Sequence, residues 1–367
     1  MNTLQRLHAE QDQSPWIDFI DRQLIASGQL AERVGEGIRG LTSNPTIFAK
    51  AVASGQYDEL IRGEIDAGHD TRRIFEEIEI ADLGDAADIL RVVYDDSDGT
   101  DGFVSIEVEP DLADDSERTL ERARHLWKRL ARPNVFVKIP ATPAGLPAIE
   151  AAIAEGININ ITLMFSVDVY RDVARAYIAG LRQRHAAGEQ ISRVASVASF
   201  FVSRVDTKVD KALDAIGSEA ALEARGQAAI ANAKLAYHAY KEIFEGGEFD
   251  DLLAAGARVQ RCLWASTSTK NPVYRDVMYA EELIGPKTVD TLPTETILAF
   301  LDHGVVSRTL DVGLDEALAA IRAVESLGIR METVTDELIS EGVAAFTKSF
   351  EDLMSVIDAQ RKALAPA

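Results

Sequence analysis

Short apolar segments alternate with longer amphipathic segments along most of the chain. Each short segment is bounded by polar residues, Gly or Pro, which is typical of a buried strand. The longer segments repeat apolar residues at helical spacing. The predicted strands are Trp16–Phe19, Ile38–Thr42, Phe103–Val108, Val135–Ile139, Ile157–Leu163, Val194–Phe201, Val259–Ala265 and Thr288–Leu292.

Helical patterns separate these strands. The clearest cover Asp115–Ala131, Pro143–Glu155, Val167–His185, Ser203–Ile216 and Glu219–Phe244. Strands that alternate with helices in this way predict an α/β fold, a (β/α)8 TIM barrel whose parallel strands close into a cylinder. A doubly wound open sheet is the alternative. Additional helices are expected between the second and third strands (residues 45–98) and at the C-terminus (314–359), and residues 1–367 are expected to form a single domain.

Polar residues share one face of several predicted strands. Side chains alternate across a strand, so Val135, Val137 and Ile139 share one face while Phe136 and Lys138 share the other. The same rule gives the fifth strand an aliphatic face of Ile157, Ile159, Ile161 and Leu163. In all, the polar faces hold Asp18, Ser105, Glu107, Asn158, Asn160, Thr162 and Ser199. If the aliphatic faces pack on the helices, the polar side chains meet at the C-terminal mouth, where barrel enzymes place their chemistry.

Lys138 is the most informative of these residues, because it interrupts the apolar segment 135–140. Burying an ammonium costs several kcal/mol unless it is paired or loses its proton. Desolvation lowers the pKa of a lysine, and a neutral amine attacks carbonyl groups. Lys138 is therefore a candidate Schiff-base nucleophile. Alternatively, it is neutralised by Glu107 within a purely structural polar network.

The composition narrows the class of protein. The formal charge is −22, with 38 basic and 60 acidic residues, which opposes nucleic-acid binding and requires a local positive cluster for any anionic substrate. No apolar stretch approaches the length of about 18 residues that a membrane span needs. Residues 1–16 lack the apolar segment of a signal peptide. The single cysteine, Cys262, suits a cytoplasmic enzyme.

No metal or nucleotide motif is found. The histidines show no metal-ligand spacing, and the sequence holds no Gly-rich nucleotide fingerprint or P-loop. The expectation is therefore chemistry without a metal or other cofactor.

Three polar segments follow predicted strands. The segment 42–46 is a turn and helix-start signal. Arg204 opens a helix after the sixth strand, where it can hold a phosphate together with backbone N–H groups. The donor-rich segment 266–271 follows the seventh strand, near where barrels commonly bind phosphate. A surface arginine and an ordinary polar loop are the alternative interpretations.

Six sequence blocks, in order along the chain, resemble those of transaldolases of the longer bacterial form. They are GLTSNPTIF (40–48), SIEVEPDLADD (105–115), NVFVKIPAT (134–142), GININITLMFS (156–166), VASFFVSRVD (197–206) and TLPTETILAF (291–300). The resemblance runs from SPWIDFIDR to about residue 303. It implies a (β/α)8 barrel and a transfer reaction of the class I aldolase type.

The resemblance also implies roles for individual residues. Lys138 matches the Schiff-base lysine and Asp18 the acid/base carboxylate, while Glu107 and Thr162 match the pair that holds the catalytic water. The matching substrate contacts are Asn44, Asn160, Ser199, the pocket wall Phe201 and the phosphate ligand Arg204.

The loop after the seventh strand departs from the family pattern. Shorter members of the family carry a second phosphate-binding arginine in this loop, and Ser268 stands near its place. Lys270 is the nearest cation, so Ser266 and Lys270 are the contacts expected there.

The implied reaction is the transfer of a dihydroxyacetone unit between sugar phosphates. The donors would be sedoheptulose 7-phosphate or fructose 6-phosphate, and the acceptors glyceraldehyde 3-phosphate or erythrose 4-phosphate, as in the non-oxidative pentose phosphate pathway. The nearest alternative is a class I aldolase that releases free dihydroxyacetone, and a non-catalytic sugar-phosphate-binding barrel is another. Sugar phosphates are the expected partners, with no nucleic acid or membrane, and the protein is expected to be a monomer or homodimer.

Overall fold

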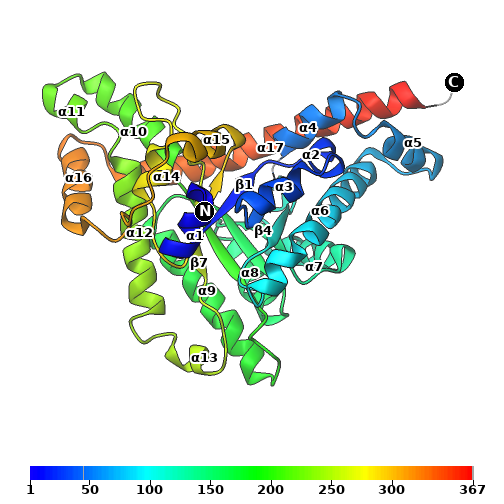
Figure 1. Ribbon diagram of the computed structural model, residues 1–367, viewed down its shortest axis with the longest axis horizontal. Coiled ribbons are helices and arrows are strands. Elements are labelled where there is room, and N and C mark those ends of the chain that lie inside the picture. The colour runs from blue at the N-terminus through cyan, green and yellow to red at the C-terminus, as the bar shows by residue number, and fades with distance from the viewer. Residues whose placement is uncertain (44, 366–367) are drawn as a thin grey trace.

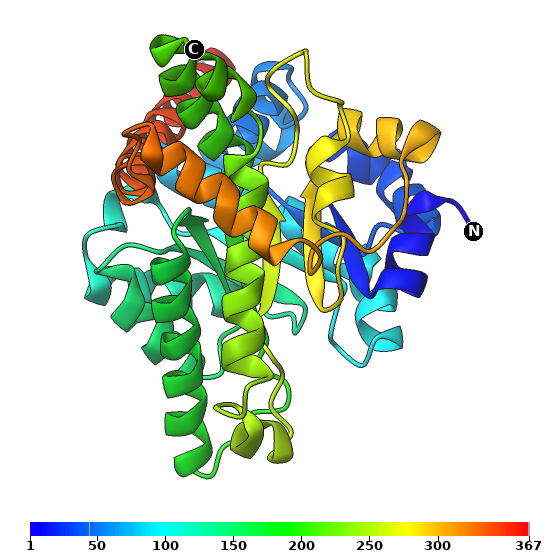
Figure 2. The ribbon, with the colours of Figure 1, turned by 90° about the vertical axis from the view of Figure 1, so that its left-hand side faces the viewer.

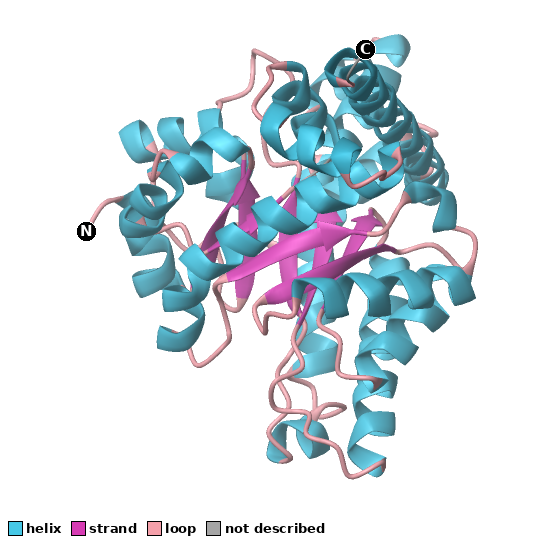
Figure 3. Cartoon of the chain, turned by 90° about the vertical axis from the view of Figure 1, so that its right-hand side faces the viewer, coloured by secondary structure: helices cyan, strands magenta, loops and turns pink. Residues whose placement is uncertain are grey.

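The computed structural model describes residues 1–43 and 45–365. It contains a closed barrel of parallel strands in sequence order, surrounded by helices (Figures 1 and 3). The first strand pairs with the last, from Gln13 beside Thr288 to Ile17 beside Leu292, which closes the cylinder and excludes the open sheet. The strands are β1 (Gln13–Asp18), β2 (Gly40–Thr42), β3 (Phe103–Glu107), β4 (Val135–Pro140), β5 (Ile159–Met164), β6 (Ser196–Phe201), β7 (Arg261–Ala265) and β8 (Thr288–Leu292).

Helices connect the strands and cover the outside of the barrel (Figure 3). Between β1 and β5 they are α2 (Arg22–Ala26), α3 (Gln29–Glu36), α4 (Pro45–Ala53), α5 (Asp58–Asp66), α6 (Thr71–Asp96), α7 (Ser116–Leu130) and α8 (Gly145–Ala154), with a short 3-10 helix at Pro110–Leu112. The others are α1 (Thr3–Gln11), α9 (Val167–Ala186), α10 (Ser203–Ile216), α11 (Glu219–Glu223), α12 (Ala228–Phe244), α13 (Asp250–Ala254), α14 (Met278–Glu282), α15 (Thr294–His303), α16 (Leu314–Ser326) and α17 (Met331–Leu364).

The two faces of the strands belong to different hydrophobic clusters, as strand parity predicts. Val135, Val137 and Ile139 of β4 are part of the large cluster that includes residues of the surrounding helices. Phe136 instead belongs to a second cluster in the barrel interior, where its ring stacks on Phe103 with 4.2 Å between centroids. The (β/α)8 prediction is thus confirmed at the level of side-chain orientation.

A glycine makes room for the largest side chain of the interior. Trp16 is fully buried among the inward-facing residues of the barrel. A Cβ atom at Gly40, the first residue of β2, would overlap the Trp16 ring. This close approach of a strand to an aromatic ring explains why glycine begins a strand, where it is otherwise unfavourable.

The additional helices lie where the sequence predicts them. Between β2 and β3 the chain forms α4, α5 and α6, and it ends with α16 and α17. In Figure 1 the long helix α17 runs beside α4 toward the C-terminus, and the two helices are in contact. In Figure 2 α16 crosses α12, with which it packs.

The predicted bounds differ most from the observed ones at two places. The first strand begins at Gln13 and includes Ser14 and Pro15. The apolar pattern does not reveal this start, because Gln13 and Ser14 are polar residues that are buried with hydrogen-bond partners at the base of the barrel. The helix predicted over Glu219–Phe244 is divided into α11 and α12. Gly226 lies between them in the left-handed region, with a φ of +71°, and its N–H donates a hydrogen bond to Asp210 Oδ1 (2.9 Å).

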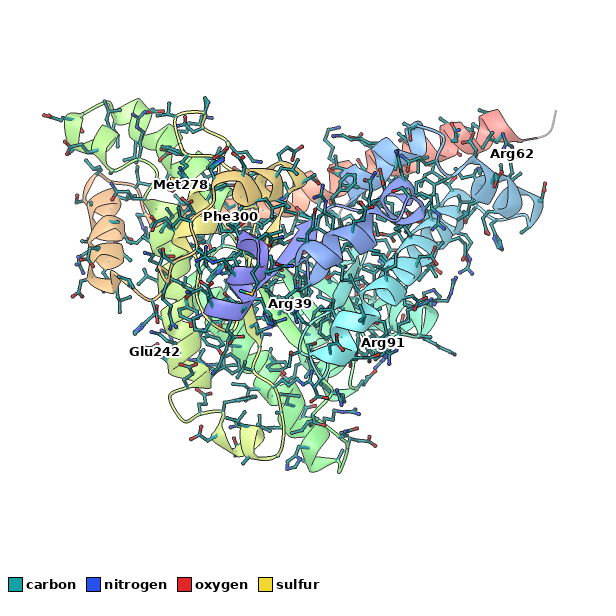
Figure 4. The ribbon with its side chains drawn as sticks, in the orientation of Figure 1. Arg39, Arg62, Arg91, Glu242, Met278 and Phe300 are labelled. Carbon is teal, nitrogen blue, oxygen red and sulfur yellow. The ribbon has the colours of Figure 1, made fainter. Side chains whose placement is uncertain are left out.

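An ionic cluster ties the N-terminal ends of the strands together. Asp101 is 1% exposed and accepts hydrogen bonds from Ser14, from Trp16 Nε1 (2.9 Å) and from Arg39 (2.7 Å). Arg261, the first residue of β7, lies 3.5 Å away. Burial alone would raise the pKa of Asp101, but Arg261 and Arg39 bring it below its usual value. Arg39, labelled in Figure 4, lies close to helix α1.

Among the described residues, no helix is both long enough and apolar enough to cross a bilayer.

Candidate active site

A cavity of about 320 Å³ opens at the C-terminal ends of the strands. Residues from each of β1 to β8 line it, together with the segment after β7 and helix α17. This is the end of the barrel at which the sequence predicts the polar residues to meet. Of the predicted site residues, the cavity is lined by Asp18, Glu107, Lys138, Thr162, Ser199, Phe201, Arg204, Ser266 and Lys270.

Lys138 projects from β4 into this cavity and is 8% exposed. Its Nζ donates hydrogen bonds to Glu107 Oε2 (3.0 Å) and to the carbonyl oxygen of Ser43 (3.3 Å). Glu107 lies beside Lys138 in the register of β3 and β4, so the pairing follows from the strand geometry. The amine therefore has a proton acceptor within hydrogen-bond distance.

Asp18, the last residue of β1, also lines the cavity. Its Oδ1 accepts a hydrogen bond from Thr42 Oγ1 (2.9 Å), which in turn lies 2.8 Å from Thr291 Oγ1. Burial raises the pKa values of both Asp18 and Glu107, and the charge of Lys138 opposes this rise. Raised carboxyl pKa values are suited to groups that exchange protons near neutral pH.

Arg204 provides an unpaired positive charge at the rim of the cavity. It is the second residue of α10, after Ser203, and its guanidinium lies over the ring of Phe201 at 5.0 Å from the centroid. In the part of the chain that the structure describes, it forms no ion pair or hydrogen bond. Burial lowers its pKa, although Asp18 opposes this effect. An uncommitted, half-buried guanidinium is a suitable ligand for an anion.

The loop after β7 faces the same rim. Ser266 has a positive φ of 57°, and its carbonyl accepts from Ser203 N–H (3.0 Å), which attaches the loop to the start of α10. Ser268 and exposed Lys270 both line the cavity, with Lys270 Nζ donating to Ser268 Oγ (2.5 Å). Arg204 and Lys270 thus bring two cations to one side of a chain that is strongly acidic overall.

Thr162 lines the cavity as the parity of β5 predicts, but the next residue does not follow the alternation. Leu163 has a φ of +56° at an irregularity in the pairing of β5 with β6, and it also faces the cavity. Leu163 still belongs to the large cluster with Ile157, Ile159 and Ile161, as predicted, but it also lines the cavity. An irregularity of this kind turns a side chain toward a functional site.

Asn160 lies beneath the cavity and does not line it. It is fully buried, and its amide donates to Ser105 Oγ (3.1 Å) and accepts from Ser199 Oγ (2.6 Å). In this arrangement it holds Ser199 in place, and direct substrate contact by Asn160 stays a prediction. Asn44 lies outside the described residues.

Several lining residues are absent from the sequence-based site. Thr42 and Thr291 complete a hydroxyl chain with Asp18. Strand parity does not single out Thr291, because it shares its face of β8 with Val289, while Thr288 and Asp290 make the other face the more polar one. Helix α17 adds a wall formed by Gly342, Ala345, Phe346 and Ser349. These residues recur at helical spacing on one face of α17, but the sequence offered no signal for which surface that face would cover.

The fold and the site together define a class of protein: a barrel enzyme that presents a buried lysine, paired with a carboxylate, to a substrate in its mouth. Comparison with known families is more specific. The family described as Transaldolase/Fructose-6-phosphate aldolase matches residues 15–357. The chain belongs to this family.

Individual relatives agree with this assignment over nearly their whole length. Transaldolase 2 of Nostoc sp. is 47% identical, and the match covers 97% of each chain. A transaldolase of Thermobifida fusca is 49% identical over 94% of this chain and 95% of its own. A transaldolase of Mycobacterium tuberculosis is 47% identical over 93% and 92%.

Proposed function

We propose that this protein is a transaldolase that moves a dihydroxyacetone unit from a ketose phosphate to an aldose phosphate through a Schiff base on Lys138. The observation that carries the proposal is the position of the Lys138 amine, 3.0 Å from Glu107 in a cavity that also holds Asp18 and the unpaired Arg204. Nucleophile, acid/base groups and anion ligand thus line one space.

The first step needs a neutral amine. Lys138 passes its proton to Glu107 and attacks the C2 carbonyl of the ketose, forming a carbinolamine. Glu107 then returns the proton to the departing hydroxyl through a water held by Thr162, and loss of water gives the iminium ion. Because one proton moves back and forth within the pair, this step needs no other acid.

The second step breaks the C3–C4 bond. The iminium accepts the electron pair of this bond, while Asp18 takes the proton of the C4 hydroxyl as general base. The aldose phosphate leaves, and an enamine stays on Lys138. When an acceptor aldehyde enters, the enamine carbon attacks it, and Asp18 gives the proton to the new hydroxyl oxygen. Hydrolysis of the iminium then releases the product ketose.

The phosphate group orients the substrate. Arg204, with the loop at 266–270, holds the phosphate at the rim, so that C2 meets Lys138 and C4 meets Asp18. Sedoheptulose 7-phosphate and fructose 6-phosphate are the proposed donors, with glyceraldehyde 3-phosphate and erythrose 4-phosphate as acceptors.

Reductive trapping tests the nucleophile. Incubation with fructose 6-phosphate and borohydride should add covalent mass to the peptide that contains Lys138, and Lys138→Ala should abolish both the adduct and turnover. Lys128→Ala, on the outer helix α7, is the matched control and should keep both. Normal turnover by Lys138→Ala would sink the mechanism.

A second experiment separates transfer from simple aldol cleavage. Products formed from fructose 6-phosphate are analysed with and without an acceptor aldehyde. A transaldolase forms sedoheptulose 7-phosphate when erythrose 4-phosphate is present and releases little free dihydroxyacetone. Equal release of free dihydroxyacetone with and without the acceptor would instead favour the aldolase alternative.

A further inference from the structure

A buried carboxyl group without a partner lies behind the candidate active site. Glu79 of α6 is 5% exposed, and within the described residues it forms no hydrogen bond and no ion pair. An ionised carboxylate in such a place would be strongly unfavourable, whereas the neutral acid is tolerated. The mechanism above does not use this residue.

Glu79 shares a small internal cavity with Glu107. The cavity is also lined by Ser43, Glu109 and aromatic residues of α6 and α17. The volume open to the centre of a water molecule is about 10 Å³. A cavity of about this size holds one water. Since Glu107 lines both this cavity and the main one, it separates Glu79 from Lys138.

Glu107 has an unused oxygen for such a water. Its Oε2 accepts from Lys138, and no other donor to either oxygen exists in the described part of the chain. A carboxylate buried with one donor is poorly compensated, and a second donor would stabilise its charged form.

We propose that Glu79 is a positioning residue for Glu107: it stays protonated and donates a hydrogen bond, through one water in the shared cavity, to the free oxygen of the Glu107 carboxylate. The O–H of Glu79 donates to the water, and the water donates to Glu107. No covalent bond changes. The effect is to hold Glu107 ionised and oriented toward Lys138 in the free enzyme, so this inference rests on the proposed function.

The charges around the pair are consistent with a neutral Glu79. Burial, and then the negative charge of Glu109, raise the pKa of Glu79 well above its usual value, and Glu107 and Glu76 add to the rise. Arg122 of α7 opposes it, but this guanidinium is already paired with Glu109 (2.6 Å) and Glu76 (2.6 Å).

Glu107 has its own charged neighbours. They are Lys138 of β4 and Asp18 of β1. From α17 the shared cavity receives Phe346 and Phe350, which carry no charge. A proton on Glu79 therefore meets no competing base from that helix.

Infrared spectroscopy tests the protonation state without reference to activity. The difference spectrum of wild type minus Glu79→Gln near pH 7 should contain the carbonyl band of one protonated carboxyl group. Glu77→Gln, a control on the same helix whose side chain pairs with Arg129 and Arg73, should show no such band. Absence of the band from the Glu79→Gln difference overturns the proposal.

The pH profile of kcat/KM tests the link to Glu107. Glu79→Leu removes the donor, so the acidic limb should move to higher pH by about half to one unit. Glu79→Gln keeps an N–H donor and should leave the limb where it is. If neither variant moves the limb, or if Glu79→Gln moves it to lower pH because a negative charge was removed, the proposal is wrong.

The two measurements also separate this inference from the proposed function. If Lys138 is not the nucleophile, reductive trapping fails in the wild type while the infrared band is unaffected. If trapping succeeds and the band is missing, only the role of Glu79 is lost. Should Glu79→Leu fail to fold, the infrared result for Glu79→Gln decides alone.

Discussion

Lys138 shows how a buried charge can be both stable and reactive. The pairing with Glu107 offsets the cost of burying the ammonium, and in the proposed mechanism the same contact provides the route by which the proton leaves. The two interpretations of Lys138 that the sequence left open, an ion pair and a nucleophile, are therefore compatible. In the proposed mechanism, the partner that neutralises the lysine is also the base that activates it.

Arg204 carries the first residue-scale prediction. Arg204→Ala should lower kcat/KM for fructose 6-phosphate about 10- to 100-fold, because one or two charge-assisted hydrogen bonds to phosphate are lost. The slow reaction of unphosphorylated fructose serves as the control and should change little. Steady-state kinetics on both substrates give the answer, and an equal loss on the two sugars would show that Arg204 does not bind the phosphate.

Asp290 of β8 carries a prediction about pH and stability. It is 1% exposed, and its Oδ1 has no hydrogen-bond partner among the described residues. Burial raises its pKa to about 7, so the folded state holds a proton that the unfolded state releases near about pH 4. Its contribution to stability is therefore fully present below about pH 4 and is lost as the pH rises to about 7.

Asp290→Asn removes this titration. Between about pH 4 and pH 8 the free energy of unfolding of the variant should improve relative to wild type by on the order of 4 kcal/mol. Urea unfolding at several pH values measures the difference. Asp251→Asn, at an exposed position, should produce no such trend. A pH-independent difference for Asp290→Asn would mean that Asp290 is ionised in the folded protein.

At the scale of elements, the sequence predicts which residues share a face of a strand where the alternation is regular, but it does not predict where that alternation is interrupted. The faces of β4 follow from the sequence because Val135, Val137 and Ile139 recur at every second position, with Phe136 and Lys138 between them. The same reasoning did not predict that Leu163 also lines the cavity, because a positive φ near the end of an apolar strand leaves no mark in the composition. The cavity wall from α17 was equally hidden. An amphipathic helix reveals that it has an apolar face but not what that face covers.

The small residue Gly342 of α17 allows the helix to approach the cavity closely. A Cβ atom there would lie 3.0 Å from Leu163 Cδ2 and 3.7 Å from Arg204 Nη1. Gly342→Leu should therefore push against Arg204. Because a displaced binding group holds the substrate less well, the KM for sugar phosphates should rise about 10-fold or more.

The stability of the variant provides its control. Replacing a glycine within a helix stabilises the helix by only about 0.5–1 kcal/mol. The midpoint temperature of thermal unfolding of Gly342→Leu should therefore stay close to that of the wild type. Ser340→Leu, at an exposed position of the same helix, should leave the KM unchanged. A Gly342→Leu variant with wild-type KM would show that α17 does not limit the space for substrate.

At the scale of the whole molecule, the two ends of the barrel have different tasks. The candidate site occupies the C-terminal ends of the strands, and the cluster around Asp101 joins β1, β7 and the segments that enter β2 and β3 at the other end. Asp101→Ala leaves Arg39 and Arg261 without their buried partner. The variant should lose about 3–5 kcal/mol of stability, yet keep the KM for its substrate.

Denaturant unfolding and steady-state kinetics of Asp101→Ala measure the two effects separately. Asp88→Ala removes an exposed partner of Arg132 and should cost less than about 1 kcal/mol. If Asp101→Ala raised the KM strongly, the two ends of the barrel would be coupled.

We also propose that residues 1–367 form one domain, as the sequence predicts. Helix α17 packs on α4, α5, α6 and α10, so the inserted and C-terminal helices share a surface with the barrel. Lys208 of α10 strengthens this contact through Glu337 (2.7 Å) and Glu341 (2.6 Å) of α17. A monomer or homodimer stays a prediction.

The pairing of the first strand with the last has a consequence for biosynthesis. A growing chain on the ribosome cannot shut its cylinder until β8 has emerged, and until then β1 has an unsatisfied edge. The wall at Ser349 arrives later still. Catalytic competence should therefore appear late in translation, and nascent intermediates with exposed strand edges would be the species that molecular chaperones protect.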